Sequence, residues 1–304
     1  NGDQMLASTL YGLSGGLQKT WAQVGVHVDQ AADLRGFANC GSEHRPNFAN
    51  AAPAIADLDG SGSLELIVPG DVYNCAIGDP AGDLYYLPWI LKRDRTRWSN
   101  ASVDWTTIPP PGASGAATIQ GQFATIEDAV VNAVPADLDG DGQREILFQS
   151  YDGKLHAWWL DKTEKHSWPY TIPGSGFRFG AEPAVADLNG DGFAEVIFST
   201  WPQKGANAVG KLIVLSYQGV LLTSIDLPAP RGGTWNGGLA APALAQLDAD
   251  ANLEAVIGTS QSGVVVYELQ GSANTRVRWG TARGSLLRNG QPASTDAVFR
   301  NGFE

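Results

Sequence analysis

The sequence predicts an all-β fold, specifically a β-propeller of about five blades with four strands in each blade. Three observations favour this fold. An acidic motif occurs four times, a short β-branched run follows each copy, and no stretch shows a helical period over the length of a helix. A β-sandwich or a solenoid is the alternative, but the length of the repeats favours four-stranded units around an axis.

The repeats are marked by acidic loops that begin at Asp57, Asp137, Asp187 and Gln246, in steps of 80, 50 and 59 residues. Each loop has a short apolar segment before it and a β-branched run after it, at residues 64–68, 146–149, 196–200 and 256–259. A turn containing glycine then leads to another expected strand, at residues 83–91, 154–160, 211–217 and 264–269. A last strand carries a tryptophan in three repeats, namely Trp98, Trp168 and Trp279.

We expect a single domain over residues 1–304. The repeats cover residues 45–105, 132–172, 180–228 and 238–280, and an insertion rich in proline and glycine covers residues 106–131. Residues 1–30 are predicted to form a hairpin without an acidic loop, and residues 285–304 to form a closing tail. Together they predict a composite fifth blade, because closure removes an exposed sheet edge. The rival hypothesis is that one end adds a strand to a neighbouring molecule.

The four acidic loops have the residue types of calcium sites. Ca²⁺ takes six to eight oxygen ligands, and glycines between the acids permit the tight turn. We call residues 57–65, 137–145, 187–195 and 246–254 loops one to four. The candidate ligands are Asp57, Asp59, Ser61, Ser63 and Glu65 in loop one; Asp137, Asp139, Asp141, the carbonyl of Gln143 and Glu145 in loop two; Asp187, Asn189, Asp191, Phe193 and Glu195 in loop three; and Asp248, Asp250 and Glu254 in loop four.

Loop four departs from this pattern. Gln246 replaces the first acid, and Ala249 and Ala251 replace both glycines. We expect about three to four bound Ca²⁺ ions in the chain. An acidic turn held by hydrogen bonds without metal is the alternative, but it explains poorly why so many like charges gather in one loop.

The repeated Pro-Ala-x-Ala-Asp-Leu-Asp-Gly-Asp-Gly-x-x-Glu pattern resembles the FG-GAP/VCBS repeat of integrin-α-like propellers, over about residues 45–285. The resemblance implies structural calcium in the loops and an exported protein that binds glycans or proteins. Some relatives of this kind carry lyase or other enzymatic domains. Loop two has Ala133 four residues ahead of its first acid, where the pattern has proline, and about five blades are fewer than such propellers often have.

Composition narrows the class of partner. The formal net charge is -12 and the pI is about 4.7, which excludes nucleic acid and disfavours an anionic membrane surface. No apolar run reaches the length of a membrane-spanning helix. The chain starts at Asn1 without a signal peptide, as a processed protein would, and residues 299–304 resemble a tail of secreted bacterial proteins. We therefore expect a secreted or cell-surface bacterial protein.

The two cysteines, Cys40 and Cys75, are expected to form a disulfide, which exported proteins keep. Two buried thiols are the alternative. Asn100-Ala-Ser102 is an N-glycosylation pattern and predicts a surface position.

For function, we expect a non-enzymatic interaction or structural module, such as an adhesin-like protein or a subunit of a surface assembly or filament. Its partner would be a protein or glycan ligand, or copies of itself joined through the termini. The alternative is a lectin that contacts glycans through Trp98, Trp105 and Trp158, for which core packing is the competing interpretation. A polysaccharide-active enzyme is a third hypothesis. We assign no catalytic residues, since strands are expected on both sides of the Gly-x-Ser-x-Gly pattern at residues 12–16.

Overall fold

The computed structural model describes residues 45–47, 51–73, 85–92, 96–106, 131–150, 152–176 and 178–284. Over these residues the chain consists of strands and turns without a helix, which confirms the predicted all-β class. It follows that no described helix is long and apolar enough to cross a membrane. The predicted hairpin at residues 1–30, the tail at 285–304, most of the insertion and both cysteines lie outside the described residues. The described strands form five sheets, none of which closes on itself.

Repeat one is a four-stranded sheet built on the long strand β4 (Glu65–Tyr73). Strands β3 (Ala54–Ala56) and β1 (Arg45–Asn47) pair with opposite ends of β4, and β5 (Tyr85–Leu91) pairs along most of its length. The short strand β2 (Ala51–Ala52) pairs in parallel with β6 (Val131–Asn132), which connects repeat one to repeat two.

Repeat two is an antiparallel meander in the order β10-β9-β8-β7. Its strands are β7 (Val134–Ala136), β8 (Glu145–Ser150), β9 (Lys154–Trp158) and β10 (Tyr170–Thr171). Every residue of β8 is buried. Because successive side chains point to opposite faces, both faces of this strand are covered by neighbouring parts of the protein.

Repeat three has the same arrangement, with longer outer strands. Strands β12 (Ala184–Asp187), β13 (Glu195–Pro202), β14 (Lys211–Leu215) and β15 (Leu221–Asp226) follow one another antiparallel, and β11 (Arg178–Gly180) pairs with the far end of β13. The sequence did not predict β15, because it lacks the tryptophan that marked the last strand of the other repeats.

Repeat four contains β16 (Ala243–Ala245), β17 (Leu253–Thr259) and β18 (Gly263–Leu269) in one sheet. The strand that carries Trp279, β19 (Arg276–Trp279), was predicted to complete this repeat, but it pairs with β12 of repeat three instead. Trp98 and Trp168 also lie just outside the named strands, between bridging residues and ahead of β10 respectively. These predictions rest on local sequence patterns, whereas the partner of a strand is decided by packing between segments far apart in the chain.

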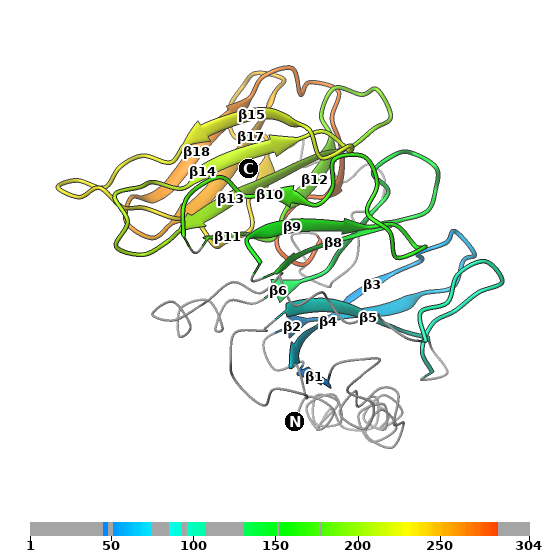
Figure 1. Cartoon of the computed structure of the whole chain (residues 1–304). Coiled ribbons are helices and arrows are strands. Elements are labelled where there is room, and N and C mark those ends of the chain that lie inside the picture. Colours follow the sequence, from blue (N-terminus) through cyan, green and yellow to red (C-terminus); the bar gives the residue numbers. More distant parts are fainter. Residues whose placement is uncertain are drawn as a thin grey trace, which may run out of the picture.

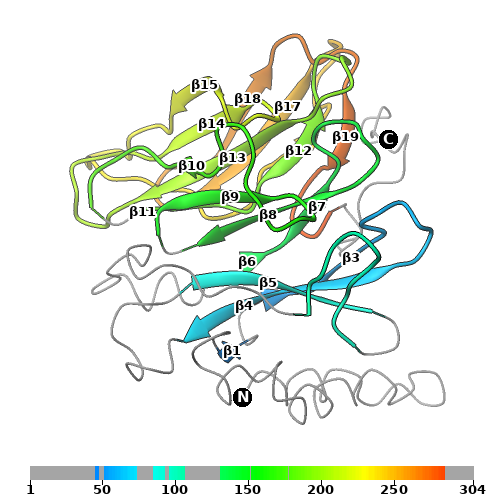
Figure 2. The ribbon, with the colours of Figure 1, turned by 45° about the vertical axis from the view of Figure 1, so that its right-hand side comes forward.

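The sheets of repeats one to four follow one another in space in the order of the sequence (Figures 1 and 2). One buried cluster joins repeats one to three and includes Ile67, Trp89, Phe148, Phe198 and Trp279. A second cluster joins the outer strands of repeat three to repeat four and includes Ile197, Leu212 and Ile257. The β-branched and aromatic runs thus form strands because each sheet buries its faces against its neighbours.

A buried carboxylate connects the repeats near the middle of the molecule. Glu182 accepts hydrogen bonds from the side chain of Asn132, from Trp279 Nε1 at 2.9 Å and from the backbone nitrogen of Arg283 at 2.9 Å. Asn132 in turn accepts a hydrogen bond from the backbone nitrogen of Ala52 at 3.1 Å. Burial raises the pKa of Glu182, and these donors oppose that effect. The network joins repeats one to three with the strand that carries Trp279, and it was not predicted from the sequence.

A partly buried network holds a histidine of repeat two. His156 Nδ1 lies 2.9 Å from Glu164 Oε1, and its Nε2 lies 3.1 Å from an oxygen of Asp152. The imidazole ring stacks on Phe148 with centroids 4.9 Å apart, and Lys154 Nζ lies 3.8 Å from the Asp152 carboxylate. Burial alone would lower the pKa of His156, but the two carboxylates outweigh it and raise the pKa to about 9.

This network predicts a loss of stability in mildly alkaline solution. The unfolded chain releases the His156 proton near pH 6.5 and the folded protein near pH 9, so the stabilisation is complete below pH 6.5 and is lost as the pH rises through 9. We expect the free energy of unfolding to fall by at most about 3 kcal/mol across this window, measured by denaturant titration. The variant His156→Gln should lose this pH dependence, whereas His166→Asn, at an exposed position, should keep it. Equal pH dependence in His156→Gln and the parent protein would contradict the assignment.

Candidate metal centres

The four acidic loops connect a short strand to a longer one in the same register. The alanine just before the first residue of the loop pairs with the glutamate that ends the loop, as Ala56 with Glu65, Ala136 with Glu145, Ala186 with Glu195 and Ala245 with Glu254. Each of these glutamates is buried. In each loop the glutamate also accepts a hydrogen bond from the backbone nitrogen of the second loop residue, a leucine, at 3.0, 2.8, 2.8 and 2.6 Å in loops one to four.

The first acid organises the backbone inside loops one to three. Its carboxylate accepts a hydrogen bond from the second glycine of the loop, as Gly62 to Asp57 at 2.8 Å, Gly142 to Asp137 at 3.2 Å and Gly192 to Asp187 at 3.0 Å. Both glycines of each of these loops have positive φ, between 71° and 97°. Residues with a Cβ adopt this conformation at a cost, so the glycines are required by the turn.

Loops one to three are stacked on one another. Arg144 of loop two donates its backbone N–H to the carbonyl of Leu58 in loop one, and Ala194 of loop three donates to the carbonyl of Leu138 in loop two, both at 2.9 Å. The Arg144 side chain adds a hydrogen bond to the carbonyl of Asp57 at 2.8 Å. Stacking brings acidic loops of like charge next to one another, which increases the repulsion between them.

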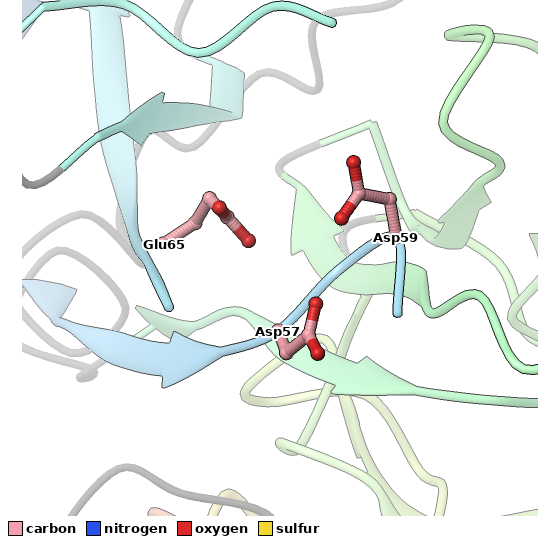
Figure 3. Close-up of side chains that lie close together, drawn as sticks. All are labelled: Asp57, Asp59 and Glu65. Atoms are coloured by element: carbon pink, nitrogen blue, oxygen red, sulfur yellow. The ribbon is translucent and has the colours of Figure 1, made fainter. Parts of the chain in front are cut away.

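Carboxylate oxygens converge in three of the loops. One ligand atom from each of Asp57, Asp59 and Glu65 lies within 4.8 Å of the others, and the same is true of Asp137, Asp139 and Glu145 and of Asp248, Asp250 and Glu254. Figure 3 shows the loop-one carboxylates pointing toward a common space. The Oδ1 atom of Asp57 is buried without a hydrogen-bond partner. An all-oxygen donor set with an unpartnered buried oxygen fits a hard cation such as Ca²⁺.

Loop three has Asn189 at the third position, where loops one and two have an acid, and its acids Asp187, Asp191 and Glu195 do not form such a cluster among the described residues. Asn189 accepts the Asp191 N–H at 2.9 Å, as the third residue does in loops one and two, and it also donates its side-chain amide to Asp191 at 3.0 Å. Asp187 accepts the same glycine hydrogen bond as in loops one and two, and Asp187 is fully buried. Loop three therefore keeps the backbone hydrogen bond to its first acid, and the side chain of Asn189, its third residue, contacts Asp191, its fifth.

The buried glutamates that end loops one to three have raised pKa values. Burial raises the pKa of Glu145 to about 8; the Leu138 N–H opposes this effect, and the charges of Asp139, Asp141 and Asp137 add to it. Burial likewise raises the pKa of Glu65 and of Glu195. A cation held at these loops would favour the ionised carboxylates, because it supplies the charge that they lack.

Side chains outside the loops orient the third residue of loops one and two, and no sequence pattern predicted these contacts. Asn100 donates to Asp59 Oδ2 at 2.9 Å, which is the main reason why the pKa of Asp59 lies below its usual value. Trp159 Nε1 donates to Asp139 Oδ2 at 3.1 Å. The carboxylates are thereby fixed before any ion binds, as the outer contacts of a metal site do.

The remaining predicted residues are the three tryptophans of the lectin hypothesis and Asn100 of the glycosylation pattern. Trp98 and Trp105 are 3% and 0% exposed, so their rings pack in the core and neither offers a face to a sugar. Trp158 is partly buried and packs edge-on against Phe148 with centroids 5.3 Å apart. Asn100 is exposed as predicted, but the nitrogen that a glycan would modify is the one bound to Asp59.

Comparison with known proteins agrees with the repeat. Residues 137–198, from the start of loop two into β13, match the model of an FG-GAP-like repeat, so the chain carries a repeat of the family that its motifs resemble. No curated protein sequence matches the chain.

Among solved structures, the exotype rhamnogalacturonan lyase YesX is similar with a TM-score of 0.32 and 16% identity, over 76% of this chain and 48% of the lyase. The rhamnogalacturonan lyase YesW is similar with a TM-score of 0.30 and 15% identity, over 80% of this chain and 51% of the lyase. The chain thus spans about half the length of each lyase, and similarity at this level carries no argument about activity.

The stacking of the loops can be tested with two glycines of loop two. A Cβ at Gly140 would lie 3.0 Å from the carbonyl oxygen of Gly192 in loop three, whereas a Cβ at Gly142 would meet no atom within 4 Å. Both substitutions to alanine incur backbone strain of about 1–2 kcal/mol, because both residues have positive φ. We expect Gly140→Ala to destabilise the protein by roughly 1 kcal/mol more than Gly142→Ala in denaturant titrations. Equal losses would show that loops two and three are not in contact in solution.

Proposed function

We propose that this chain is an exported, calcium-stabilised β-propeller that serves as a non-enzymatic interaction or structural module. The single observation that carries the proposal is the loop geometry. In loops one and two, three carboxylates from one turn converge on a common space, and the first acid, the glycines and the closing glutamate keep the same hydrogen bonds through loop three. Such loops suit Ca²⁺, which prefers several oxygen ligands in a flexible geometry.

The residues that would hold the ion are the predicted ones. In loop two they are Asp137, Asp139, Asp141 and Glu145, with the carbonyl of Gln143 as a backbone ligand. Bound calcium supplies positive charge at the point where these carboxylates meet. The chain itself supplies rigidity, because Trp159 holds Asp139 and the Leu138 N–H holds Glu145.

The position of the loops supports a structural role for the ion. Each loop connects two paired strands, and loops one to three stack through backbone hydrogen bonds. An ion that neutralises one loop therefore stabilises both its own sheet and its neighbour. Metal that is bound only by the folded chain adds its binding free energy to the stability of the fold.

The acids of these loops are committed to the loops themselves, which favours an interaction module over an enzyme. Their carboxylates accept backbone N–H groups of the same turn, an arrangement that fixes them as ligands and turn residues. The burial of Trp98 and Trp105 removes two of the three aromatic contacts on which the lectin hypothesis depended.

The partner we propose is a protein or glycan on a surface, or further copies of the chain joined through its termini. Specific glycan capture on an array, lost in a Trp158→Ala variant, would favour a lectin, and turnover of a polysaccharide would contradict the non-enzymatic role.

Calcium removal provides the direct test. We expect a chelator to lower the melting temperature strongly, because each site occupied at about 1,000 times its Kd contributes about 4 kcal/mol. The double variant Asp137→Asn/Asp139→Asn should melt at a lower temperature in calcium and show a smaller effect of the chelator. The control Asp226→Asn removes an exposed acid outside the loops and should leave the chelator effect unchanged. A parent protein that melts at the same temperature with and without chelator would disprove the proposal.

A further inference from the structure

We infer that loop four closes without a metal ion, because the side-chain amide of Gln246 takes the place of the cation. This inference rests on the proposed function for the ions of the other loops. What it states about loop four depends only on the contacts of loop four itself.

The Gln246 amide forms hydrogen bonds where a cation would bind. Its Nε2 donates to the carbonyl of Asn252 at 3.0 Å and to the carbonyl of Asp250. Asn252 is the seventh residue of loop four and corresponds to Gln143, whose carbonyl we assign as a ligand in loop two. The carbonyl that would bind the ion therefore already accepts a hydrogen from the side chain at the first position.

The oxygen of the same side chain is also committed. Gln246 Oε1 accepts a hydrogen bond from the backbone nitrogen of Asp248 at 2.9 Å. In loops two and three the first residue is an aspartate that accepts backbone N–H groups with both of its oxygens. An amide offers one acceptor and two donors, so it crosslinks N–H groups and carbonyls of one turn without an ion.

The backbone of loop four agrees with this reading. Loops one to three place two glycines at positive φ, but Ala249 and Ala251 do not adopt positive φ. The turn therefore follows a different path between the same paired strands. Asp248 is exposed, whereas the corresponding Asp59 and Asp139 of loops one and two are partly buried. Asp250 is exposed, as is the corresponding Asp141 of loop two. Water can solvate exposed carboxylates, which removes much of the need for a counter-ion.

Loop four is also separated from the stack. Instead of a direct backbone contact with loop three, a turn at residues 272–275 lies between the two loops. Leu253 donates its N–H to Ser272 Oγ at 2.7 Å, and Thr275 Oγ1 donates to the carbonyl of Leu188 at 3.2 Å. Leu247 is 48% exposed, whereas the corresponding Leu58 and Leu138 are fully buried.

Two facts favour the opposite conclusion. The carboxylates of Asp248, Asp250 and Glu254 lie within reach of one ion, and Glu254 Oε1 is buried without a hydrogen-bond partner. We give the amide more weight, because a bound cation would have to displace its two hydrogen bonds to carbonyls and place positive charge beside the amide hydrogens. The convergence of Asp248, Asp250 and Glu254 agrees with their sequence prediction as ligands; the proposal differs from that prediction in giving the place of the ion to the amide.

The first test counts ions. Equilibrium dialysis against calcium, or native mass spectrometry, gives the number of ions bound by the full chain. We expect Asp248→Asn/Asp250→Asn to bind as many ions as the parent protein, and the matched variant Asp137→Asn/Asp139→Asn to bind one fewer. Loss of one ion from the loop-four variant would overturn the inference. Absence of calcium binding by every variant would instead refute the proposed function.

The second test does not depend on calcium binding anywhere in the chain. Gln246→Met keeps the length of the side chain and removes its hydrogen bonds without adding a charge, so we expect its melting temperature in chelator to fall by several degrees below that of the parent. Gln261→Met makes the same change at an exposed glutamine, whose amide donates to Ser260 at 3.4 Å, and should have little effect. Equal melting temperatures of the two variants in chelator would show that the Gln246 amide does not hold the loop.

Discussion

The structure depends on one buried glutamate at the end of each acidic loop. Its carboxylate binds the backbone nitrogen of the second loop residue, and its backbone pairs with the alanine that ends the preceding strand. These two contacts set the length of the loop and the register of the strands on either side. A shift by one residue would exchange the buried and exposed faces of each sheet, so register decides which side chains form the core. The buried position of the glutamates also makes their charge costly, so each carboxylate needs a hydrogen-bond donor or a positive charge beside it.

The buried carboxylates of this fold have different partners. Glu182 accepts hydrogen bonds from Asn132, from Trp279 and from a backbone nitrogen, and the acids beside His156 contact its imidazole ring. In loops one and two the closing glutamate accepts one backbone N–H, and further carboxylates lie close to it. The proposed function places a hard cation there, because stacked acidic loops concentrate negative charge. In loop four the Gln246 amide donates to the backbone carbonyls of Asp250 and Asn252 and so holds the turn itself.

Stacking and metal binding are therefore linked in the proposed function. Loops one to three contact each other through backbone hydrogen bonds, and a neutralised loop is a better neighbour for the next acidic loop. Strand β19 and the turn at residues 272–275 interrupt this series, because β19 adds to the sheet of repeat three and the turn separates loop three from loop four. The loop beyond the interruption is the one with alanines in place of glycines. Both the loss of its glycines and its separation from the stack distinguish loop four from loops one to three.

The sequence by itself determined the all-β class, the four loops, most of the long strands and the acids that converge in loops one and two. These features depend on local spacing: alternate acids with glycines between them form a turn, and β-branched runs form strands. Only the tertiary structure decided the partner of β19, the burial of Trp98 and Trp105, the contact of Asn100 with Asp59 and the stacking of the loops. Each of these joins residues that are far apart in the chain, and spacing within a motif carries no information about such contacts. The amide of Gln246 lies between the two cases, since the substitution is visible in the sequence but its hydrogen bonds to two carbonyls follow from the path that the backbone takes.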